Sequence, residues 1–272
     1  MIIRESLEHE ARKLAEAFVI SFGRDNIDPD RFEKIVQKFQ GEIQHEIVHF
    51  LVAEEKGKII GLGGETRHSG ASYIGFLGVL PGHRNHRIGS TMFQRLLDQS
   101  KVHNPTVELF ANPGVETLYQ KFGFKEEHHA HVFEISGLNG WVKMDVEIIR
   151  DSIPPWVLEL DRKAMGFDRS RLLNFLIKIQ DNKLVCIEQD GFGFSTDTSI
   201  GPLVAKDHGI AASLIKCLLS TSSKKIIVPD HAEGILKPYS PKKVQSCLKM
   251  THGKPLRAES RYVLGYHAFA TS

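Results

Sequence analysis

Residues 79–90 read VLPGHRNHRIGS, and this stretch decides the fold of the first half of the chain. It joins the end of an expected strand to the start of an expected helix through a polar loop. The first N–H groups of a helix have no intrahelical partner, and the helix dipole adds partial positive charge. The loop therefore predicts a pocket for an anionic phosphate. Arg84, His86 and Arg87 add positive charge that suits a pyrophosphate, and Gly89 lets the backbone approach a ligand without a Cβ.

Around this loop the apolar pattern predicts a mixed α/β half with a mostly antiparallel start. Helical spacing runs from Leu7 to Phe22 and again from about Pro29, behind a short first strand. Strand-like runs at 49–54 and 58–66 flank a glycine-containing turn, which indicates a hairpin. The other expected elements are a strand at 72–80, a helix from Ile88 to Leu97, a strand at 106–111, a helix at 114–122 and a strand at 131–136.

The pattern restarts near residues 140–155, where Ile153-Pro154-Pro155 marks a local boundary. Paired prolines continue neither a helix nor a central strand. We expect one domain at 1–143 and another at 144–272. The second contains expected helices at 156–165 and 169–179, strands at 183–188, 191–195 and 200–205, a helix around 210–218 and a strand at 225–229. This order echoes the first half and suggests an ancient duplication.

The composition is typical of an ordinary globular protein. The 272 residues are 41% hydrophobic and 25% charged, with a formal net charge of +2. A charge this small implies no field that captures nucleic acid or a membrane surface. The sequence shows no signal-peptide pattern and no apolar run that spans a bilayer, and its three cysteines have no C-x-x-C spacing. We therefore expect a cytoplasmic protein without nucleic-acid or membrane partners.

The loop carries a family resemblance. The run V-x-P-x-x-R-x-x-x-I-G resembles the acyl-CoA pyrophosphate loop of the GNAT superfamily of N-acetyltransferases, whose usual pattern is R/Q-x-x-G-x-G/A. Arg84 and Gly89 match the ends of that pattern, and Arg87 stands where the middle glycine is expected. Asn85 replaces another glycine, but Asn tolerates the left-handed conformation better than most residues.

A second segment, NPGVETLYQKFGF at 112–124, looks like the GNAT signature N-x-x-A-x-x-L-Y-x-x-x-G-F. The hairpin is similar to the second and third strands of the family, so three matches in the right order cover roughly residues 1–140. The resemblance implies an α/β (α+β) fold of tandem GNAT-like domains. Each domain would be a mixed, mostly antiparallel sheet flanked by helices.

The resemblance also implies the residues that bind acetyl-CoA. Strand-end residues would offer main-chain groups to the pantetheine arm: Leu77, Gly78 and Val79. Loop residues would hold the pyrophosphate: Arg84, Asn85, His86, Arg87, Ile88, Gly89 and Ser90. Asn112 would hydrogen-bond the pantetheine or hold the strand end. No metal site is expected at the histidines of 128–131, which have the spacing of a strand.

The implied reaction is direct attack of a neutral amine on the thioester. Tyr119 matches the tyrosine of the family that protonates or stabilises the departing sulfur, and the ordinary pKa of a phenol is close to that of a thiol. It also belongs to the expected cofactor-binding residues.

The identity of the general base stays open. Candidates are Glu65, Glu108, Tyr73, His68, His128, His129 and His131, or a water chain. We favour Glu108, which shares strand parity with Asn112. Strand parity also predicts one common face for Tyr73, Gly75, Leu77 and Val79, so that Tyr73 could overlook the thioester. Each carboxylate also has the ordinary interpretation of a strand-face side chain.

The second half resembles the degenerate GNAT-like domain that follows the catalytic domain in some tandem GNATs. The resemblance lies in residues 161–173 and 200–215. Only residues 206–209 separate its expected strand from its helix, without an arginine-and-glycine loop. We therefore expect this domain to bind no CoA, and to wall the acceptor site or serve as a scaffold.

Other functions were weighed against acyl transfer. An acyl-CoA-binding sensor without turnover is the alternative, favoured by the loop departures and the undefined base. A nucleotide or NAD binder is disfavoured, because the glycine motif follows a hairpin rather than opening a βαβ unit. The acceptor, a small-molecule or peptide amine, is not specified by the sequence, since variable loops build such pockets. Acyl-chain preference and oligomeric state are open as well, with a homodimer as one option.

Overall fold

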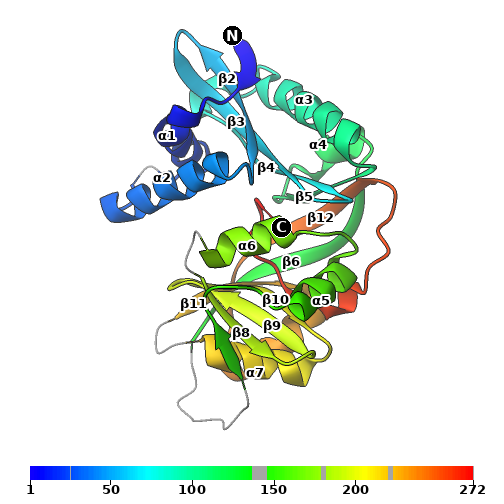
Figure 1. Cartoon of the computed structure of the whole chain (residues 1–272). Helices are drawn as coiled ribbons and strands as arrows, with labels where there is room; N and C mark the ends of the chain where they lie inside the picture. Colours follow the sequence, from blue (N-terminus) through cyan, green and yellow to red (C-terminus); the bar gives the residue numbers. More distant parts are fainter. Residues whose placement is uncertain (25, 137–145, 179–181, 220–222, 272) are drawn as a thin grey trace. The chain divides into compact units, whose positions relative to one another are not determined.

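The chain forms two compact units that do not simply follow one another in sequence. The computed structural model describes residues 1–24, 26–136, 146–178, 182–219 and 223–271 (Figure 1). The first unit contains residues 1–67, 71–109 and 271, and the second contains residues 68–70 and 110–270. The expected domain boundary at 143/144 and the end of the expected helix 169–179 lie outside the described residues. That boundary stays a prediction.

The first unit is built on a mixed, mostly antiparallel sheet. In spatial order its strands are β1 (Ile2–Glu5), β2 (His49–Glu55), β3 (Lys58–Arg67), β4 (Ser72–Val79) and the first residues of β5 (Thr106–Ala111). Neighbours are antiparallel except for β4 and β5, which are parallel. In the turn between β2 and β3, Lys56 and Gly57 both have positive φ, as a two-residue hairpin loop requires. The predicted fold class and hairpin are confirmed.

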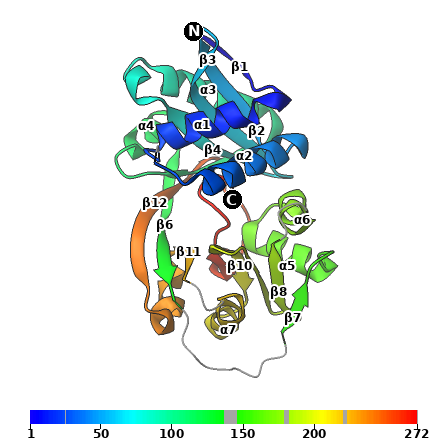
Figure 2. The same ribbon diagram turned by 90° about the vertical axis from the view of Figure 1, so that its left-hand side faces the viewer.

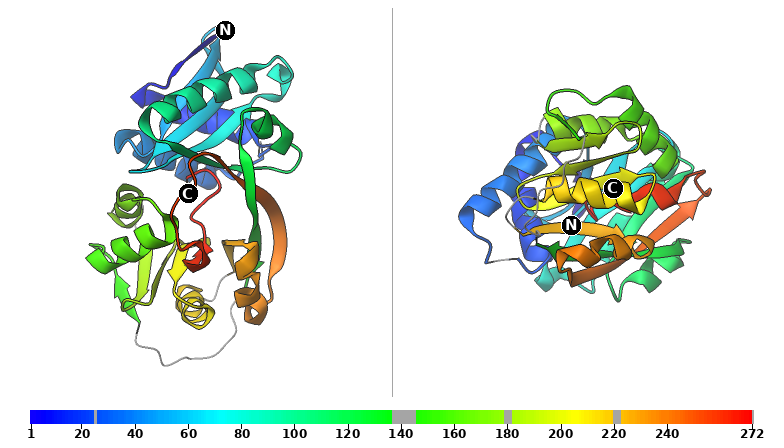
Figure 3. Two further views of the ribbon diagram at one scale, coloured as in Figure 1. Left: turned by 90° about the vertical axis from the view of Figure 1, so that its right-hand side faces the viewer. Right: turned by 90° about the horizontal axis from the view of Figure 1, so that it is seen from below.

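Helices cover both faces of this sheet. In Figure 2, α1 (Ala11–Ser21) and α2 (Pro29–Gln44) lie in front of the sheet, and in the left view of Figure 3, from the opposite side, α3 (Ile88–His103) lies in front. The expected apolar stripe of α3 is confirmed, because Met92, Phe93 and Leu96 are fully buried. Gly63 of β3 lets α3 pack closely, since a Cβ there would lie 2.7 Å from Leu96 Cδ1.

β4 contains a bulge that the sequence did not reveal. Between two of its register pairs with β3, β4 has one residue more than its partner, and Phe76 has a φ of 58°. An extra residue shifts the alternation of side chains by one. The predicted common face of Tyr73, Gly75, Leu77 and Val79 is therefore wrong. Beyond the bulge, Leu77 and Val79 lie on the α3 side, opposite to Tyr73.

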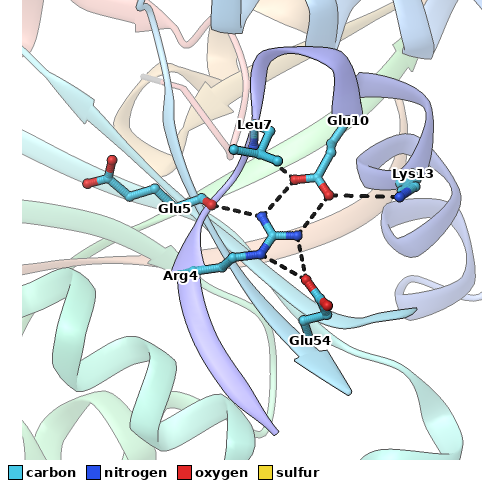
Figure 4. A network of polar contacts seen from close by, with 6 residues as sticks. All are labelled: Arg4, Glu5, Leu7, Glu10, Lys13 and Glu54. Atoms are coloured by element: carbon cyan, nitrogen blue, oxygen red, sulfur yellow. Dashed lines mark hydrogen bonds and ion pairs between the residues drawn. The ribbon is translucent and has the colours of Figure 1, made fainter. Parts of the chain in front are cut away.

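Arg4 fixes the corner from which α1 begins (Figure 4). Its guanidinium donates two hydrogen bonds of 2.8 Å to the Glu10 carboxylate, and its Nε donates one of 2.8 Å to Glu54 on β2. Glu10 also accepts the N–H of Leu7, at the start of the short 3-10 helix η1 (Glu8–Glu10). The hydrogen bond from Arg4 lowers the pKa of Glu10 to about 2. β1, β2 and the start of α1 are thus held by one ionic cluster.

The second unit has a sheet with the spatial order β12-β6-β11-β10-β9-β8-β7, and β13 also pairs with β10. Over its described residues, β10 and β11 are the one parallel pair. Its strands are β6 (Lys125–Ile135), β7 (Glu147–Ile149), β8 (Lys183–Ile187), β9 (Gly191–Ser195), β10 (Ser199–Ala205), β11 (Lys224–Pro229), β12 (Lys242–Gly253) and β13 (Val263–Gly265). Its helices are α4 (Glu116–Lys121), α5 (Pro155–Met165), α6 (Ser170–Lys178) and α7 (His208–Leu218), with 3-10 segments at Asp230–Tyr239 and Ser260–Tyr262. The sequence missed β7, β12 and β13.

β6 belongs to the first half of the sequence but is paired on both sides with strands of the second half. β11 pairs with it from Lys224 to Pro229, and β12 pairs with it from Lys242 to Thr251. The left view of Figure 3 shows β6 in green beside β12 in orange. The second unit therefore interleaves strands from both halves of the sequence.

Cys186, Cys217 and Cys247 are all free. No helix in the part of the chain that the structure describes combines the length and the apolar character that a bilayer crossing needs.

A chain cut at residue 143 tests the interleaving. It keeps β6 but lacks both β11 and β12, so Val132 and Phe133, which are buried in the full chain, lose their neighbouring strands. We expect this fragment to lose the cooperative thermal transition of the full chain, measured by circular dichroism. Co-expression with residues 144–272 as a separate chain should restore it. A fragment that melts cooperatively at the temperature of the full chain would contradict the expectation.

Candidate functional site

The loop between β4 and α3 contains two residues in the left-handed conformation. Asn85 has a φ of 66°, as expected from its tolerance of this region. Arg87, the N-cap of α3, has a φ of 61°. It occupies the position where the family pattern has a glycine, and it adopts the conformation that glycine reaches without strain. The loop geometry of the glycine motif is thus kept, at a cost of roughly 1–2 kcal/mol for a residue with a Cβ.

Main-chain N–H groups are available to an anion along this loop. Among the described residues, none of the N–H groups from Asn85 to Ser90 has an acceptor within the protein, whereas the next, that of Thr91, donates to Arg87 O at 2.9 Å. A Cβ on Gly89 would meet only Val79 Cγ2, at 3.5 Å, so the start of α3 is open. Unpaired donors and the dipole of a long helix match the chemistry of a pyrophosphate.

Arg84 fastens the loop to the ends of α1 and β4. Its Nη2 donates to Ser21 O at 2.7 Å and its Nε donates to Val79 O at 3.1 Å. Ser21 is the last residue of α1, where the helix dipole favours a cation. The sequence had assigned the charge of Arg84 to a phosphate. In the structure its guanidinium binds carbonyls, while the exposed guanidinium of Arg87 has no partner among the described residues.

The edge of β4 is open beyond Tyr73. Its parallel pairing with β5 comprises only Ser72 with Val107 and Tyr73 with Glu108. No other strand of the described chain pairs with β4 on that side. The half-buried residues 77–79 can therefore offer main-chain donors and acceptors to an extended ligand, which is the role the sequence predicted for them.

Glu65 is held in a buried polar network. Its carboxylate is 1% exposed and accepts hydrogen bonds of 2.9 Å from Ser72 Oγ and from Arg67 Nε. Asn104, at the C-terminal end of α3, donates to Ser72 Oγ at 3.0 Å. Because both carboxylate oxygens already have donors, this arrangement disfavours Glu65 as the general base.

Glu108 and Tyr73 are neighbours. They form a register pair between β5 and β4, and both side chains are buried, at 2% and 1% exposure. Side chains of a register pair lie on the same face of a sheet. The structure thus brings together two of the candidate bases and leaves Glu65, on the opposite face, apart from them.

Asn112 and Tyr119 belong to the second unit. Within that unit, side chains of β12 form hydrogen bonds with Asn112. Asn112 Oδ1 accepts a hydrogen bond from Gln245 Nε2 at 3.1 Å and one from Cys247 Sγ at 3.3 Å. Tyr119 is 9% exposed, and burial raises its pKa to about 12, with a smaller contribution from Cys247 once that thiol ionises at high pH. The sequence missed Gln245 and Cys247 because the lysine-rich stretch 242–250 shows no alternating apolar face.

Two of the candidate histidines are engaged elsewhere in the second unit. The ring of His68 stacks on Phe167, with the centroids 5.1 Å apart. His128 Nε2 lies 2.8 Å from Tyr266 Oη. Burial and the nearby lysine Lys249 lower the pKa of His128 to about 4, so this imidazole is neutral at physiological pH.

His129 and His131 stack on each other on β6, with centroids 6.1 Å apart. His131 Nδ1 lies 2.7 Å from Ser246 Oγ, and its Nε2 lies 3.2 Å from the Glu233 carboxylate. Over the described ranges, no three His, Cys, Asp or Glu side chains are grouped so as to hold a metal ion.

In the second half of the chain, protein groups occupy the strand edge and the helix start that correspond to the open edge of β4 and the open start of α3. β10 pairs in parallel with β11 over two residues, as β4 does with β5, but β13 then pairs with β10 at Leu203 and Val204. α7 is capped by its own carboxylate, because Asp207 accepts the N–H of Ile210 at 2.9 Å. A strand occupies the edge and an anion occupies the helix end.

Comparison with known proteins agrees with this geometry. Two family models, both of the acetyltransferase (GNAT) domain, match residues 15–148 and 157–265. The chain belongs to the GNAT acetyltransferases. It is a tandem GNAT protein, and acyl transfer is the general activity that this membership supports. β6 lies within the first match, although its partners β11 and β12 lie within the second.

Solved structures share the tandem fold. A proposed acetyltransferase from Pyrococcus horikoshii is 26% identical, with a TM-score of 0.92, over 100% of this chain and 95% of the other. A GCN5-related N-acetyltransferase from Sphaerobacter thermophilus is 16% identical, with a TM-score of 0.64, over 95% and 98% of the two chains. One from Kribbella flavida is also 16% identical, with a TM-score of 0.61, over 93% and 71%. No curated protein matches the chain.

Two arginine variants separate the structural role of the loop from its binding role. Arg84→Ala should lower the free energy of unfolding by about 1 kcal/mol, because two carbonyls lose a charged donor. Arg87→Ala, on the same loop, removes no protein partner and should change it by less than about 0.5 kcal/mol. Urea unfolding measures both values. Equal losses would show that Arg84 does not anchor the loop.

Proposed function

We propose that this protein transfers an acetyl group from acetyl-CoA to an amine by direct attack. The observation that carries the proposal is the row of unpaired N–H groups from Asn85 to Ser90 at the start of α3, next to the open edge of β4. Few ligands combine a diphosphate with an extended amide-containing arm. Acetyl-CoA does, and GNAT acetyltransferases use it as their acyl donor.

The residues present fit that donor. The N–H groups of the loop and the exposed guanidinium of Arg87 would hold the pyrophosphate, with the side chain of His86 nearby in sequence. Main-chain groups of residues 77–79 would bind the pantetheine arm, as would the carboxamide of Asn112. One molecule would bind per chain, because β13 and Asp207 fill the corresponding positions of the second half.

The reaction needs a group that takes the amine proton. The amine nitrogen forms a bond to the carbonyl carbon of the acetyl group, the carbon–sulfur bond breaks, and the amine gives up a proton. Glu108, buried beside Tyr73, is the favoured acceptor of that proton, directly or through water.

The departing sulfur needs a hydrogen-bond donor, and Tyr119 is the candidate. Its raised pKa of about 12 keeps the phenol protonated at any physiological pH. The same value lies further above the pKa of a thiol than that of an ordinary phenol, and each unit of mismatch costs about 1.4 kcal/mol for full proton transfer. Tyr119 therefore acts first as a hydrogen-bond donor to the developing thiolate, and the proton moves as the sulfur leaves.

Titration with acetyl-CoA tests the binding half of the proposal. Isothermal titration calorimetry should show one equivalent per chain. Gly89→Trp should abolish binding, because the indole fills the open helix start, whereas Gly89→Ala should retain it, since its Cβ meets Val79 Cγ2 at an ordinary 3.5 Å. Two equivalents of acetyl-CoA per chain would refute the statement that β13 and Asp207 prevent binding in the second half. An absence of binding to the wild type would overturn the acyltransferase proposal itself.

Release of free thiol tests turnover. The wild type is given acetyl-CoA and a panel that contains a polyamine, an amino acid, an amino sugar and a peptide amine. Release above the amine-free rate supports transfer. If acetyl-CoA binds but no amine of the panel causes release of thiol, the alternative of an acyl-CoA sensor is favoured. The left-handed conformation of Arg87 and the hydrogen-bonded carboxylate of Glu65 support that alternative.

Tyr119→Phe separates the chemistry from cofactor binding. We expect turnover to fall about 10- to 100-fold, because the thiolate loses its donor. The Kd for acetyl-CoA should stay within about threefold, since the pyrophosphate loop is untouched. Because the pKa of Tyr119 is raised to about 12, the wild type should show no loss of turnover from phenol ionisation up to about pH 10. Unchanged turnover in the variant would remove Tyr119 from the mechanism.

A further inference from the structure

β12 lies within the second GNAT match but contacts a residue of the first GNAT signature. Gln245 and Cys247 of β12 both donate to Asn112 Oδ1, at 3.1 and 3.3 Å. Gln245 Nε2 also lies 3.4 Å from Cys247 Sγ, so the three side chains form a closed cluster. We call Asn112, Gln245 and Cys247 the β12 cluster. More than a hundred positions separate its two parts in the sequence, and they meet because β12 lies between β5, which ends at Ala111, and β6 in the sheet.

The hydrogen bonds of the β12 cluster fix the orientation of the Asn112 carboxamide. An amide oxygen has two lone pairs, and here both receive a donor. The carboxamide NH2 is therefore the group that Asn112 presents to a ligand. Without Gln245 and Cys247, the two ends of the amide would be nearly equivalent and free to exchange. The orientation is thus imposed by the second half of the chain.

Cys247 acts here as a neutral donor. It is 2% exposed, and burial raises the pKa of its thiol to about 11, so it keeps the S–H that it donates. A thiol of this kind is a poor nucleophile. It also lies close enough to Tyr119 to affect that phenol. Cys247 therefore lies next to both second-unit residues of the proposed site.

We propose that Gln245 and Cys247 are positioning residues for acyl transfer, which hold the Asn112 carboxamide with its NH2 toward the acyl donor beside Tyr119. The second GNAT domain would then take part in the reaction of the first without binding CoA itself. This rests on the proposed function, because Asn112 and Tyr119 act on the thioester only if the chain binds acetyl-CoA.

Single substitutions provide the first test. Gln245→Leu and Cys247→Ala each remove one donor to Asn112 and should lower kcat about tenfold, a loss of about 1.4 kcal/mol. Cys247→Ser keeps a donor and should recover kcat to within about threefold of the wild type. The Kd for acetyl-CoA should change less than about threefold in all of them, because the loop at 84–90 is unaltered. Val244→Ala, an exposed neighbour on β12, is the matched control and should leave kcat unchanged.

A double-mutant cycle with Asn112→Ala provides the decisive test. If Gln245 and Cys247 act through Asn112, their substitution in the Asn112→Ala background should cause no further loss of kcat. Leu248→Ala, a buried β12 position outside the cluster, should instead lower thermal stability without this coupling. Additive losses, or wild-type kcat in both Gln245→Leu and Cys247→Ala, would overturn the inference while the proposed function stands. A wild type that binds no acetyl-CoA or releases no thiol would overturn both.

Discussion

The first turn of an α-helix leaves N–H groups that the helix cannot satisfy, and the candidate site depends on how α3 treats them. Here they stay unpaired from Asn85 to Ser90, with no acceptor from the described protein. Keeping them so requires a particular loop. Arg84 ties it to the ends of α1 and β4, and Arg87 accepts a left-handed conformation at the N-cap. Unsatisfied donors are costly when buried, so they persist only in contact with water or with a ligand that pairs with them.

The second half satisfies the corresponding groups with its own residues. Asp207 places a carboxylate on the first turn of α7, where an anion is favoured by the unpaired N–H groups and the dipole. β13 supplies main-chain partners to the edge of β10. A carboxylate of the chain thus occupies the helix end, and a strand of the chain occupies the strand edge. The end of α7 and the edge of β10 are thus satisfied by ordinary capping and strand pairing.

The sequence was sufficient wherever local chemistry decides the structure. The hairpin at residues 55–58, the loop at 84–90 and the apolar stripe of α3 follow from turn residues and periodicity. Prediction from the sequence failed where a single extra residue or a strand distant in the sequence determines the local structure. The bulge at Phe76 reverses the facing of Leu77 and Val79 without leaving a mark in the apolar pattern. β12 was missed because its faces are shaped by β6, more than a hundred residues away, rather than by alternation within Lys242–Gly253. Gln245 and Cys247 were missed with it.

Because β6 pairs with β11 and β12, the domains of the sequence and the compact units of the structure do not coincide in this chain. Two family matches divide the sequence once, between residues 148 and 157, yet the second compact unit includes β6 from before that division, paired with β11 and β12 from after it. A second half that merely stood beside the first could be lost without exposing residues of β6. A second half that supplies both ladder partners of β6 cannot be lost without exposing Ala130, Val132 and Phe133, which the ladders bury. Structural dependence of this kind preserves β12 in place, and any side chain on β12 that reaches Asn112 is then available to the chemistry of the first half.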